Sequence, residues 1–412
     1  MILLLLQQRL QATSPGRAER SIKLVRLIHL ALLGACLLVL AAPASASTVL
    51  VMGPDGHVTR ENDRFVAPAG PVPSVVPRAR SAGGNVVRVA LDGLLAGKEI
   101  DQVEHDKRAQ DYDDALFIRN QLTGTRRREL NSVIGLLNGF ASRGELTKSR
   151  LHVLWLQLNR NVEWWGFSDR IPGSGERVRF KNSRVLYQYF PGQGLEFHPL
   201  ANWGRLSALI KDGYNENARE FLAELLPMGS ERGGALTWEY FFYFGGGRPP
   251  WTSGLSQGTA LVALVRSYQR LNAAAYLAAA RRGLQIYTLP TPVGVRVRTK
   301  RGNHYAEYSF APRTRIINGF IQALNGLWDV RPYSSLARSL YRAGDREARL
   351  ELPKYDTGRW SRYDNSRGSI SPLNYHVLLR DFLRDLCRRT GTRLYCNKAS
   401  RFTAYLRRGP PS

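Results

Sequence analysis

Tyrosines and arginines gather in one stretch of the sequence, residues 301–379, at a density that a hydrophobic core does not require. Tyr363 follows Arg362 and lies four residues before Arg367, and Tyr375 comes twelve residues after Tyr363. A phenol is useful for proton transfer near neutral pH only if nearby cations lower its pKa from about 10. Arginine binds carboxylates through two parallel hydrogen bonds. These residue types indicate proton transfer on an acidic substrate, with the arginines lowering the pKa of Tyr363.

Several short segments are spread between about residues 185 and 375. They are residues 189–195 (YFPGQGL), 251–258 (WTSGLSQG), 305–308 (YAEY), 318–320 (NGF) and 352–358 (LPKYDTG), followed by Tyr363-Asp364 and Tyr375-His376. In this order they resemble segments of the C-terminal domain of the D-glucuronyl C5-epimerases, and the chain resembles a bacterial member of that family. Their common order makes the resemblance more specific than any one segment would.

The resemblance implies inversion at C5 of glucuronate, without a metal or nicotinamide cofactor. Inversion removes the proton beside a carboxylate and returns one on the opposite face, so the carboxylate must be neutralised and acid/base groups must flank the ring. At matching positions the family has essential tyrosines at Tyr308, Tyr363 and Tyr375, and a glutamate at Glu307. We expect Tyr363 and Tyr375 to act on opposite faces of the sugar, with Glu307 as a base or as a support for Tyr308.

The resemblance also suggests residues that bind the substrate. Arg367 or Arg362 is expected to bind the uronate carboxylate, although much of the family has an arginine where this chain has Ser366. The other candidates are Gln193, Trp251, Gln257, Tyr305, Arg313 and His376. Trp251 fits a buried core position as well as sugar stacking, and Tyr305 fits packing better than contact with substrate.

Helical periodicity dominates from about residue 111, for example in Leu130, Val133 and Leu137, which share one helix face. Successive helices with short connections predict a mainly α fold, and the resemblance implies an α/α toroid, an incomplete α/α barrel, with short β-hairpins at the cleft rim. The hairpins are predicted within residues 178–190 and 293–308. A regular strand in the second would place Tyr305 and Glu307 on one face and Tyr308 on the other.

Residues 22–46 have the pattern of a secretory signal: a charged start, an apolar run over 27–40 and a small-residue cleavage site at 44–46. We predict a signal peptide over 1–46, in which 1–20 form an N-terminal extension. A short β and proline-rich segment with a linker follows over 47–85, and a helical domain covers 86–412. The protein is expected to be secreted or attached to the cell envelope, and an uncleaved signal would associate it with the membrane.

Removal of the signal leaves two cysteines, Cys387 and Cys396, nine residues apart. In an exported chain such a pair is predicted to form a disulfide, with a reduced pair as the alternative. Two cysteines and scattered histidines do not make a metal site. The glycines at 245–247 lack the following lysine and hydroxyl residue of a phosphate loop.

The chain of 412 residues is strongly basic, with a formal net charge of +26, of which +22 remains after residue 46. Its composition, 43% hydrophobic and 22% charged, is that of a globular protein. The charge favours a polyanionic partner. Because no nucleic-acid-binding signature accompanies it, we expect an acidic, uronate-containing polysaccharide rather than nucleic acid.

Three functions fit these observations. The first is a uronosyl C5-epimerase of the heparosan-modifying type, an isomerase acting on a polysaccharide such as a glycosaminoglycan. The second is a polysaccharide lyase, which would remove the same proton and then eliminate across C4–C5. The third is a basic envelope protein that binds anionic glycans without turnover. The nearly complete tyrosine and glutamate set favours the first, and Ser366 is the feature that favours the third.

Overall fold

The computed structural model describes residues 47–67 and 85–410. The predicted signal peptide with its extension, and most of the proline-rich linker, lie outside the described residues. The described part of the chain consists of helices α3 to α14, short 3₁₀ turns and three small sheets. The prediction of a mainly α fold with small β elements is therefore confirmed.

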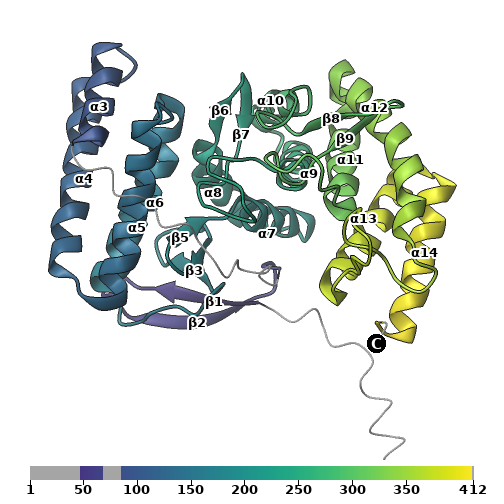
Figure 1. Cartoon of the computed structure of the whole chain (residues 1–412), viewed down its shortest axis with the longest axis horizontal. Coiled ribbons are helices and arrows are strands. Elements are labelled where there is room, and N and C mark those ends of the chain that lie inside the picture. The colour runs from purple at the N-terminus through teal and green to yellow at the C-terminus, as the bar shows by residue number, and fades with distance from the viewer. Residues whose placement is uncertain (1–46, 68–84, 411–412) are drawn as a thin grey trace, which may run out of the picture. The chain divides into compact units, whose positions relative to one another are not determined.

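The first four helices pack on one another in sequence order (Figure 1). They are α3 (Val86–Ala96), α4 (Gln102–Gln121), α5 (Gly124–Ser142) and α6 (Lys148–Phe167). Helices α5 and α6 also contact strand β5 (Gly194–Phe197). The apolar residues that predicted a helix around Leu137 are buried in α5, as the periodicity requires.

The largest sheet has five strands in the order β2-β1-β3-β4-β5. The other strands are β1 (Ser47–Met52), β2 (Val58–Asp63), β3 (Arg177–Phe180) and β4 (Tyr187–Phe190). The predicted hairpin of β3 and β4 is present, with Arg177 opposite Gln188. Strand β1 pairs in parallel with β3, so the N-terminal strands complete a sheet whose other members lie more than a hundred residues later.

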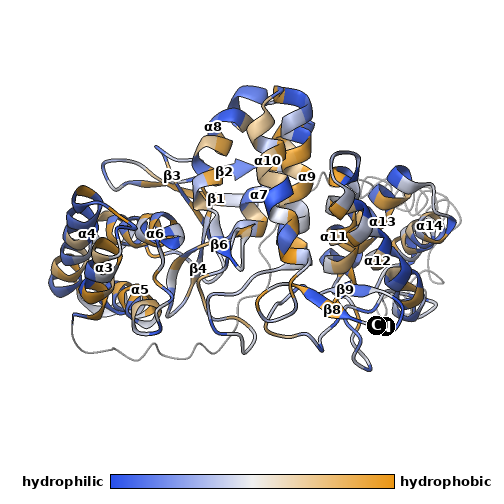
Figure 2. Ribbon diagram, turned by 90° about the horizontal axis from the view of Figure 1, so that it is seen from above, coloured by the Kyte–Doolittle hydropathy of each residue, from blue (hydrophilic) through white to orange (hydrophobic). Residues whose placement is uncertain are grey.

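The remaining helices follow this sheet along the chain. They are α7 (Pro199–Lys211), α8 (Asn215–Leu225), α9 (Gly254–Leu271), α10 (Ala274–Gly283), α11 (Ile317–Val330), α12 (Ser335–Glu351), α13 (Leu373–Thr390) and α14 (Arg393–Arg408). Helix α9 contacts α7, α10 and α11, and Figure 2 shows it as predominantly hydrophobic. Almost every residue of α9 and α11 is buried, which makes this helix pair the centre of the core.

A close approach of α9 and α11 explains a glycine in each helix. A Cβ atom on Gly258 would lie 2.7 Å from the Cα atom of Ala323, and one on Gly326 would lie 2.5 Å from the carbonyl oxygen of Gly258. Both are far inside van der Waals contact, so the two backbones can meet only where these side chains are absent. The glycines of the WTSGLSQG segment therefore include one that fixes helix packing.

Two short hairpins complete the fold: β6 (Ser230–Arg232) with β7 (Ala235–Thr237), and β8 (Arg296–Arg298) with β9 (Asn303–Tyr305). The β8–β9 hairpin was predicted, but its second strand ends at Tyr305. The expectation that strand alternation governs Tyr305, Glu307 and Tyr308 is therefore wrong, because the last two residues lie in a loop beyond the strand.

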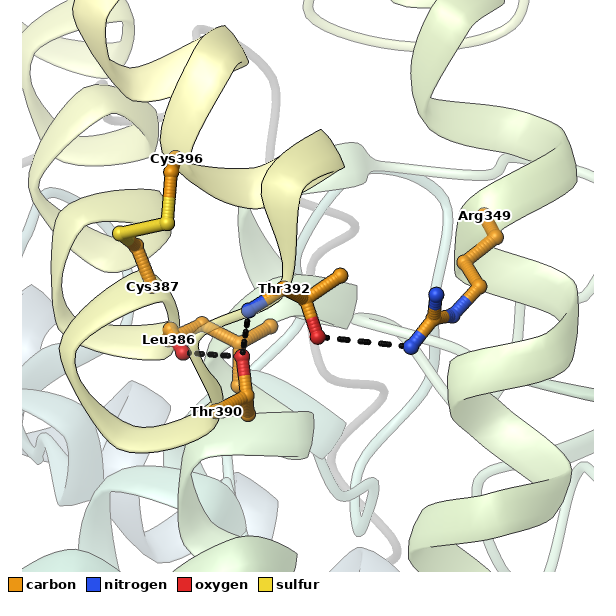
Figure 3. Close-up of a disulfide and its surroundings, with 6 residues drawn as sticks. All are labelled: Arg349, Leu386, Cys387, Thr390, Thr392 and Cys396. Carbon is orange, nitrogen blue, oxygen red and sulfur yellow. Dashed lines mark hydrogen bonds between the residues drawn. A yellow bond between two sulfur atoms is a disulfide. The ribbon is translucent and has the colours of Figure 1, made fainter.

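A disulfide joins the last two helices, between Cys387 of α13 and Cys396 of α14, in agreement with the predicted pairing (Figure 3). The turn between these helices is held by Thr390, whose hydroxyl donates to the carbonyl of Leu386 and accepts from the amide of Thr392. Arg349 of α12 donates to the hydroxyl of Thr392 at 3.4 Å. These contacts fix the end of α13 against its neighbours.

Among the helices within residues 85–410, none is at once long enough and apolar enough to cross a membrane.

Candidate active site

Three of the four predicted catalytic residues, Glu307, Tyr308 and Tyr375, line a single cavity of about 400 Å³. Its size is within the range of small-ligand sites. One wall is aromatic and consists of Phe190, Tyr240, Phe242, Phe244 and Trp251. An apolar wall with a few polar groups is typical of a site that binds a small molecule.

The loop that carries Glu307 and Tyr308 is held by the segment before α9. The amide of Gly254 donates to the carbonyl of Ala306 at 2.9 Å, and the amide of Ser309 donates to the carbonyl of Thr252 at 3.0 Å. These bonds lie on both sides of Glu307 and Tyr308. Two of the recognised segments, WTSG and YAEY, are thus parts of one local structure.

Glu307 lies against the first turn of α11 at a point where that helix has no side chain. A Cβ atom on Gly319 would be 2.5 Å from Oε2 of Glu307 and 3.0 Å from its Cβ. Gly319 therefore provides the space for the carboxylate. Oε2 itself is buried without a hydrogen-bond partner, and the residue is 5% exposed.

Tyr363 is brought next to this loop by backbone contacts. Its carbonyl accepts a hydrogen bond from the amide of Ile317 at the start of α11, and its amide donates to the carbonyl of Ser369. Tyr375 comes from the first turn of α13, and the centroids of the two rings are 4.9 Å apart. The four predicted catalytic residues are thus in one place, although they come from three separate segments.

The predicted arginines line a different cavity. Arg313, Arg362 and Arg367 border a more open space of about 680 Å³, together with Arg315 and Lys354. Residue 362 pairs with residue 370 in an extended segment, where successive side chains point to opposite sides. Arg362 and Tyr363 consequently face different spaces. Neither Arg362 nor Arg367 lines the cavity of Glu307 and Tyr375, and their predicted binding of the uronate carboxylate stays a prediction.

Residues 232–404, which include all four predicted catalytic residues, match the family model described as D-glucuronyl C5-epimerase C-terminus. This part of the chain is thus similar to the C-terminal part of the D-glucuronyl C5-epimerases.

Two relatives illustrate the similarity. The chain is 30% identical over 151 residues to D-glucuronyl C5-epimerase of Caenorhabditis elegans, a match that covers 32% of this chain and 24% of the relative. It is 27% identical over 169 residues to an uncharacterized protein of Methanocaldococcus jannaschii, covering 39% of this chain and 54% of that protein. The chain thus spans about a quarter and about half of the lengths of these relatives.

Within residues 232–404, burial controls the acid/base properties. Burial raises the pKa of Glu307 to about 7. Burial, followed by the negative charge of Glu307, raises the pKa of Tyr375 to about 12 and that of Tyr363 further still. The expectation that arginines lower the pKa of Tyr363 is therefore wrong, because the arginines concerned line the other cavity. A carboxylate whose pKa lies near neutral pH can act as a base, and the protonated phenols beside it can act as acids.

Several predicted substrate contacts belong to the core instead. Tyr305 is fully buried, and its hydroxyl donates to the carbonyl of Leu340 at 2.7 Å. His376 is fully buried, stacks on Trp360 with centroids 3.8 Å apart and accepts a bond from the amide of Ser361. Neither residue lines the cavity of Glu307. Their aromatic character, which suggested sugar contact, serves packing.

The remaining candidates, Gln193, Gln257 and Trp251, differ in whether they line the cavity. Gln193 is buried and uses both ends of its amide on the backbone of Tyr243, at 3.0 and 2.7 Å, so it fixes a turn and is not free for substrate. Gln257 is buried in α9 and is not among the cavity-lining residues. Trp251 does line the cavity, but its ring stacks on Tyr240 at 4.0 Å, so it forms a wall.

Three further residues that were not among the candidates line this cavity: Arg177, Tyr240 and His198. Arg177 alternates with apolar residues in its strand, a pattern that resembles a solvated face. Only the pairing of β3 with strands on both sides buries it. Within residues 47–67 and 85–410, no group of three or more His, Cys, Asp or Glu side chains is arranged to hold a metal ion.

Proposed function

We propose that this protein is a uronosyl C5-epimerase that converts D-glucuronate to L-iduronate within an acidic polysaccharide. The observation that carries the proposal is the convergence of Glu307, Tyr308, Tyr363 and Tyr375 around one sugar-sized cavity, within the segment that is similar to the C5-epimerases. Heparosan, a polymer of alternating glucuronate and N-acetylglucosamine, is the first substrate to test.

In the proposed mechanism Glu307 removes the C5 proton. Its raised pKa makes it a stronger base than an ordinary carboxylate, while much of it remains ionised at neutral pH. The electron pair of the C–H bond moves into the substrate carboxylate and forms an enediolate. Tyr363 or Tyr375, which a raised pKa keeps protonated at neutral pH, then gives a proton to the opposite face of C5.

The cycle closes when the proton on Glu307 replaces the one that the tyrosine has lost. Tyr308 is close to both Glu307 and Tyr363, because both residues influence its pKa. This division of labour differs from the sequence-based expectation of two tyrosines as acid and base. The upward pKa shifts of the tyrosines favour Glu307 as the base.

The wider arrangement is proposed on the same grounds. Successive helices pack in pairs, α7 with α8, α9 with α10, α11 with α12 and α13 with α14, and this pairing supports an α/α toroid of the kind the family resemblance implies. The open cavity bordered by Arg313, Arg362 and Arg367 would bind anionic groups on neighbouring sugars of the polymer. We also propose that the protein acts outside the cytoplasm, because residues 22–46 have the pattern of a secretory signal.

Incubation with heparosan in D₂O tests the proposal. We expect deuterium at C5, iduronate beside glucuronate, and no unsaturated chain ends. Glu307→Gln should lower the rate of incorporation by about 10²-fold or more, and so should at least one of Tyr363→Phe and Tyr375→Phe, the one that removes the acid. Tyr268→Phe is the matched control, because this tyrosine of α9 is not a lining residue of the cavity.

The same incubation distinguishes the alternatives. A lyase would produce unsaturated ends and a rise in ultraviolet absorbance near 235 nm. A glycan-binding protein would bind the polymer without either change. Incorporation at the wild-type rate in Tyr363→Phe and Tyr375→Phe would mean that the acid is another residue.

A further inference from the structure

The proposed reaction needs a cation inside the cavity, because an unneutralised carboxylate makes C5–H too weak an acid. Three arginines line the cavity: Arg177, Arg266 and Arg389. Arg389 is already occupied by two bonds to Asp329, at 2.7 and 2.8 Å. Arg266 donates to the hydroxyl of Ser207 at 2.8 Å and lies in the field of Asp329 and Asp385.

Arg177 differs from the other two. It is 5% exposed, and its Nε and Nη1 atoms are buried without hydrogen-bond partners. Among the described residues no carboxylate forms an ion pair with it. A buried charge without a counter-ion is strongly unfavourable unless something else stabilises it. Burial lowers the pKa of Arg177 only to about 10, so the guanidinium remains charged at neutral pH.

The neighbours of Arg177 offer further donors. His198 accepts a bond from the amide of Ala201 at its Nδ1 atom, so the proton of the neutral ring is on Nε2. Burial and the charge of Arg177 keep this histidine neutral by lowering its pKa well below the ordinary value. Gln188, opposite Arg177 in the β3–β4 register, also lines the cavity, and its amide oxygen has no partner. Rotation of that amide would turn its NH₂ group towards an anion.

Two carboxyl groups lie near this group, and among the described residues neither forms an ion pair with Arg177. Glu196 lies opposite Gln188 on the next strand; one of its oxygens accepts a bond from Gln157 at 2.6 Å, and burial raises its pKa well above the ordinary value. Glu307 borders the same cavity, and the charges of Glu307 and Arg177 both influence the pKa of Tyr240. The cavity thus has a cationic group and a candidate base along one continuous lining.

We propose that Arg177 is the carboxylate-binding residue of this cavity, assisted by His198 and Gln188, and that its ligand is the carboxylate of a sugar. The assignment to the uronate that reacts rests on the proposed function. The binding of a sugar carboxylate by Arg177 does not depend on the proposed function. In the reaction, Arg177 would neutralise the carboxylate and stabilise the negative charge that develops on it as C5 loses its proton.

Binding measurements on the full chain test this site directly. The probes are a short heparosan oligosaccharide and the same oligosaccharide with its carboxyl groups reduced to alcohols. The wild type should bind the first about 10- to 100-fold more tightly, the usual worth of hydrogen bonds to a charged group. Arg177→Met should lose most of this preference, the remainder being due to the arginines of the open cavity, and Arg177→Lys should lose less of it. Arg179→Met, which removes an arginine of the same strand that pairs with Glu61, should keep it.

A thermal measurement separates this role from a structural one. Without ligand, Arg177→Met should unfold at the same temperature as the wild type or a higher one, because it removes a buried, unpaired charge. A markedly lower unfolding temperature would identify a structural arginine and overturn the proposal. Equal binding of both probes by the wild type would overturn it too, and that comparison needs no variant.

The D₂O experiment then distinguishes the two proposals. Carboxylate-dependent binding through Arg177 without any deuterium at C5 would reject the epimerase function and leave the carboxylate site in place. Deuterium incorporation at the wild-type rate in Arg177→Met would reject the carboxylate site and leave the epimerase function in place.

Discussion

Glu307 has the combination of properties that a base in this cavity needs. It is buried, one of its oxygens lacks a partner, and its pKa is raised to about 7. We therefore expect kcat/KM for C5 exchange to rise with pH, to be half-maximal at about pH 7 and to level above it, because the ionised form is the active one. Rates measured from pH 5 to pH 9 check this. A rise centred near pH 4.5 would mean that Glu307 is not the group that titrates.

The same carboxyl group should make stability depend on pH. Its pKa is higher in the folded chain than in the unfolded chain, so its contribution is fully present below the unfolded value and is lost as pH rises through about 7. The unfolding temperature of the wild type should therefore fall more between pH 5 and pH 8 than that of Glu307→Gln. Parallel curves for the two proteins would contradict the raised pKa.

Gly319 is predicted to control the position of Glu307. In Gly319→Ala the new Cβ atom would collide with Oε2, so the carboxylate must move. A displacement of about 1 Å can reduce turnover by about 10²-fold. We expect a large loss of C5 exchange with little change in polymer affinity.

Gly93→Ala is the matched control for this variant. It places the same methyl group in α3 at a position with no neighbouring atom within 4 Å. It should leave turnover unchanged and stabilise the fold slightly, because alanine is the better helix former. Unchanged turnover in Gly319→Ala would show that Glu307 tolerates the displacement.

The sequence pointed to three tyrosines that the structure brings together, but not to Tyr240 or to the arginine of this cavity. Tyr308, Tyr363 and Tyr375 lie in recognisable segments, and their convergence needs only that those segments form one cleft. The orientation of Arg362 depends on strand alternation around residue 363, and the burial of Arg177 depends on long-range strand pairing. Neither property is encoded locally.

At the scale of elements, helix α13 connects the site to the C-terminal part of the fold. Its first turn carries Tyr375, and its last turns carry Cys387, which is bonded to α14. The helices were predictable because each has an apolar face that repeats within its own sequence. The five-stranded sheet was not, because β1 and β3 are more than a hundred residues apart and nothing in either strand specifies the other.

The disulfide is predicted to stabilise the fold without affecting chemistry. It closes a loop of nine residues, so its loss in Cys396→Ser should cost about 2–3 kcal/mol in the chain-entropy account. Turnover should change little, because Cys387 is three turns of α13 away from Tyr375. Denaturant unfolding measures the first effect. Mass spectrometry of unreduced peptides tests the bond itself, and two free thiols would reject it.

At the scale of the whole molecule, the dominant feature is charge. The formal net charge is +26, and Arg313, Arg362 and Arg367, which border the open cavity, form no ion pair with any carboxylate among the described residues. Such a surface attracts a polyanion before any sugar enters the inner cavity. The two cavities would thus have different tasks: the open one holds the polymer, and the enclosed one holds the reacting sugar.

This division predicts how binding should respond to salt. Affinity for heparosan should fall steeply as ionic strength rises, because salt screens the attraction between exposed charges. The double variant Arg362→Gln/Arg367→Gln should bind more weakly at low salt and show a shallower salt dependence, with turnover at saturation nearly unchanged. The control Lys107→Gln/Lys211→Gln removes the same charge from residues that line neither cavity, and should retain the wild-type salt dependence more closely.

A neutral glucan that binds as tightly as heparosan at high salt would contradict the electrostatic account. Equal salt curves for the two double variants would contradict a role for the open cavity and leave only the overall charge.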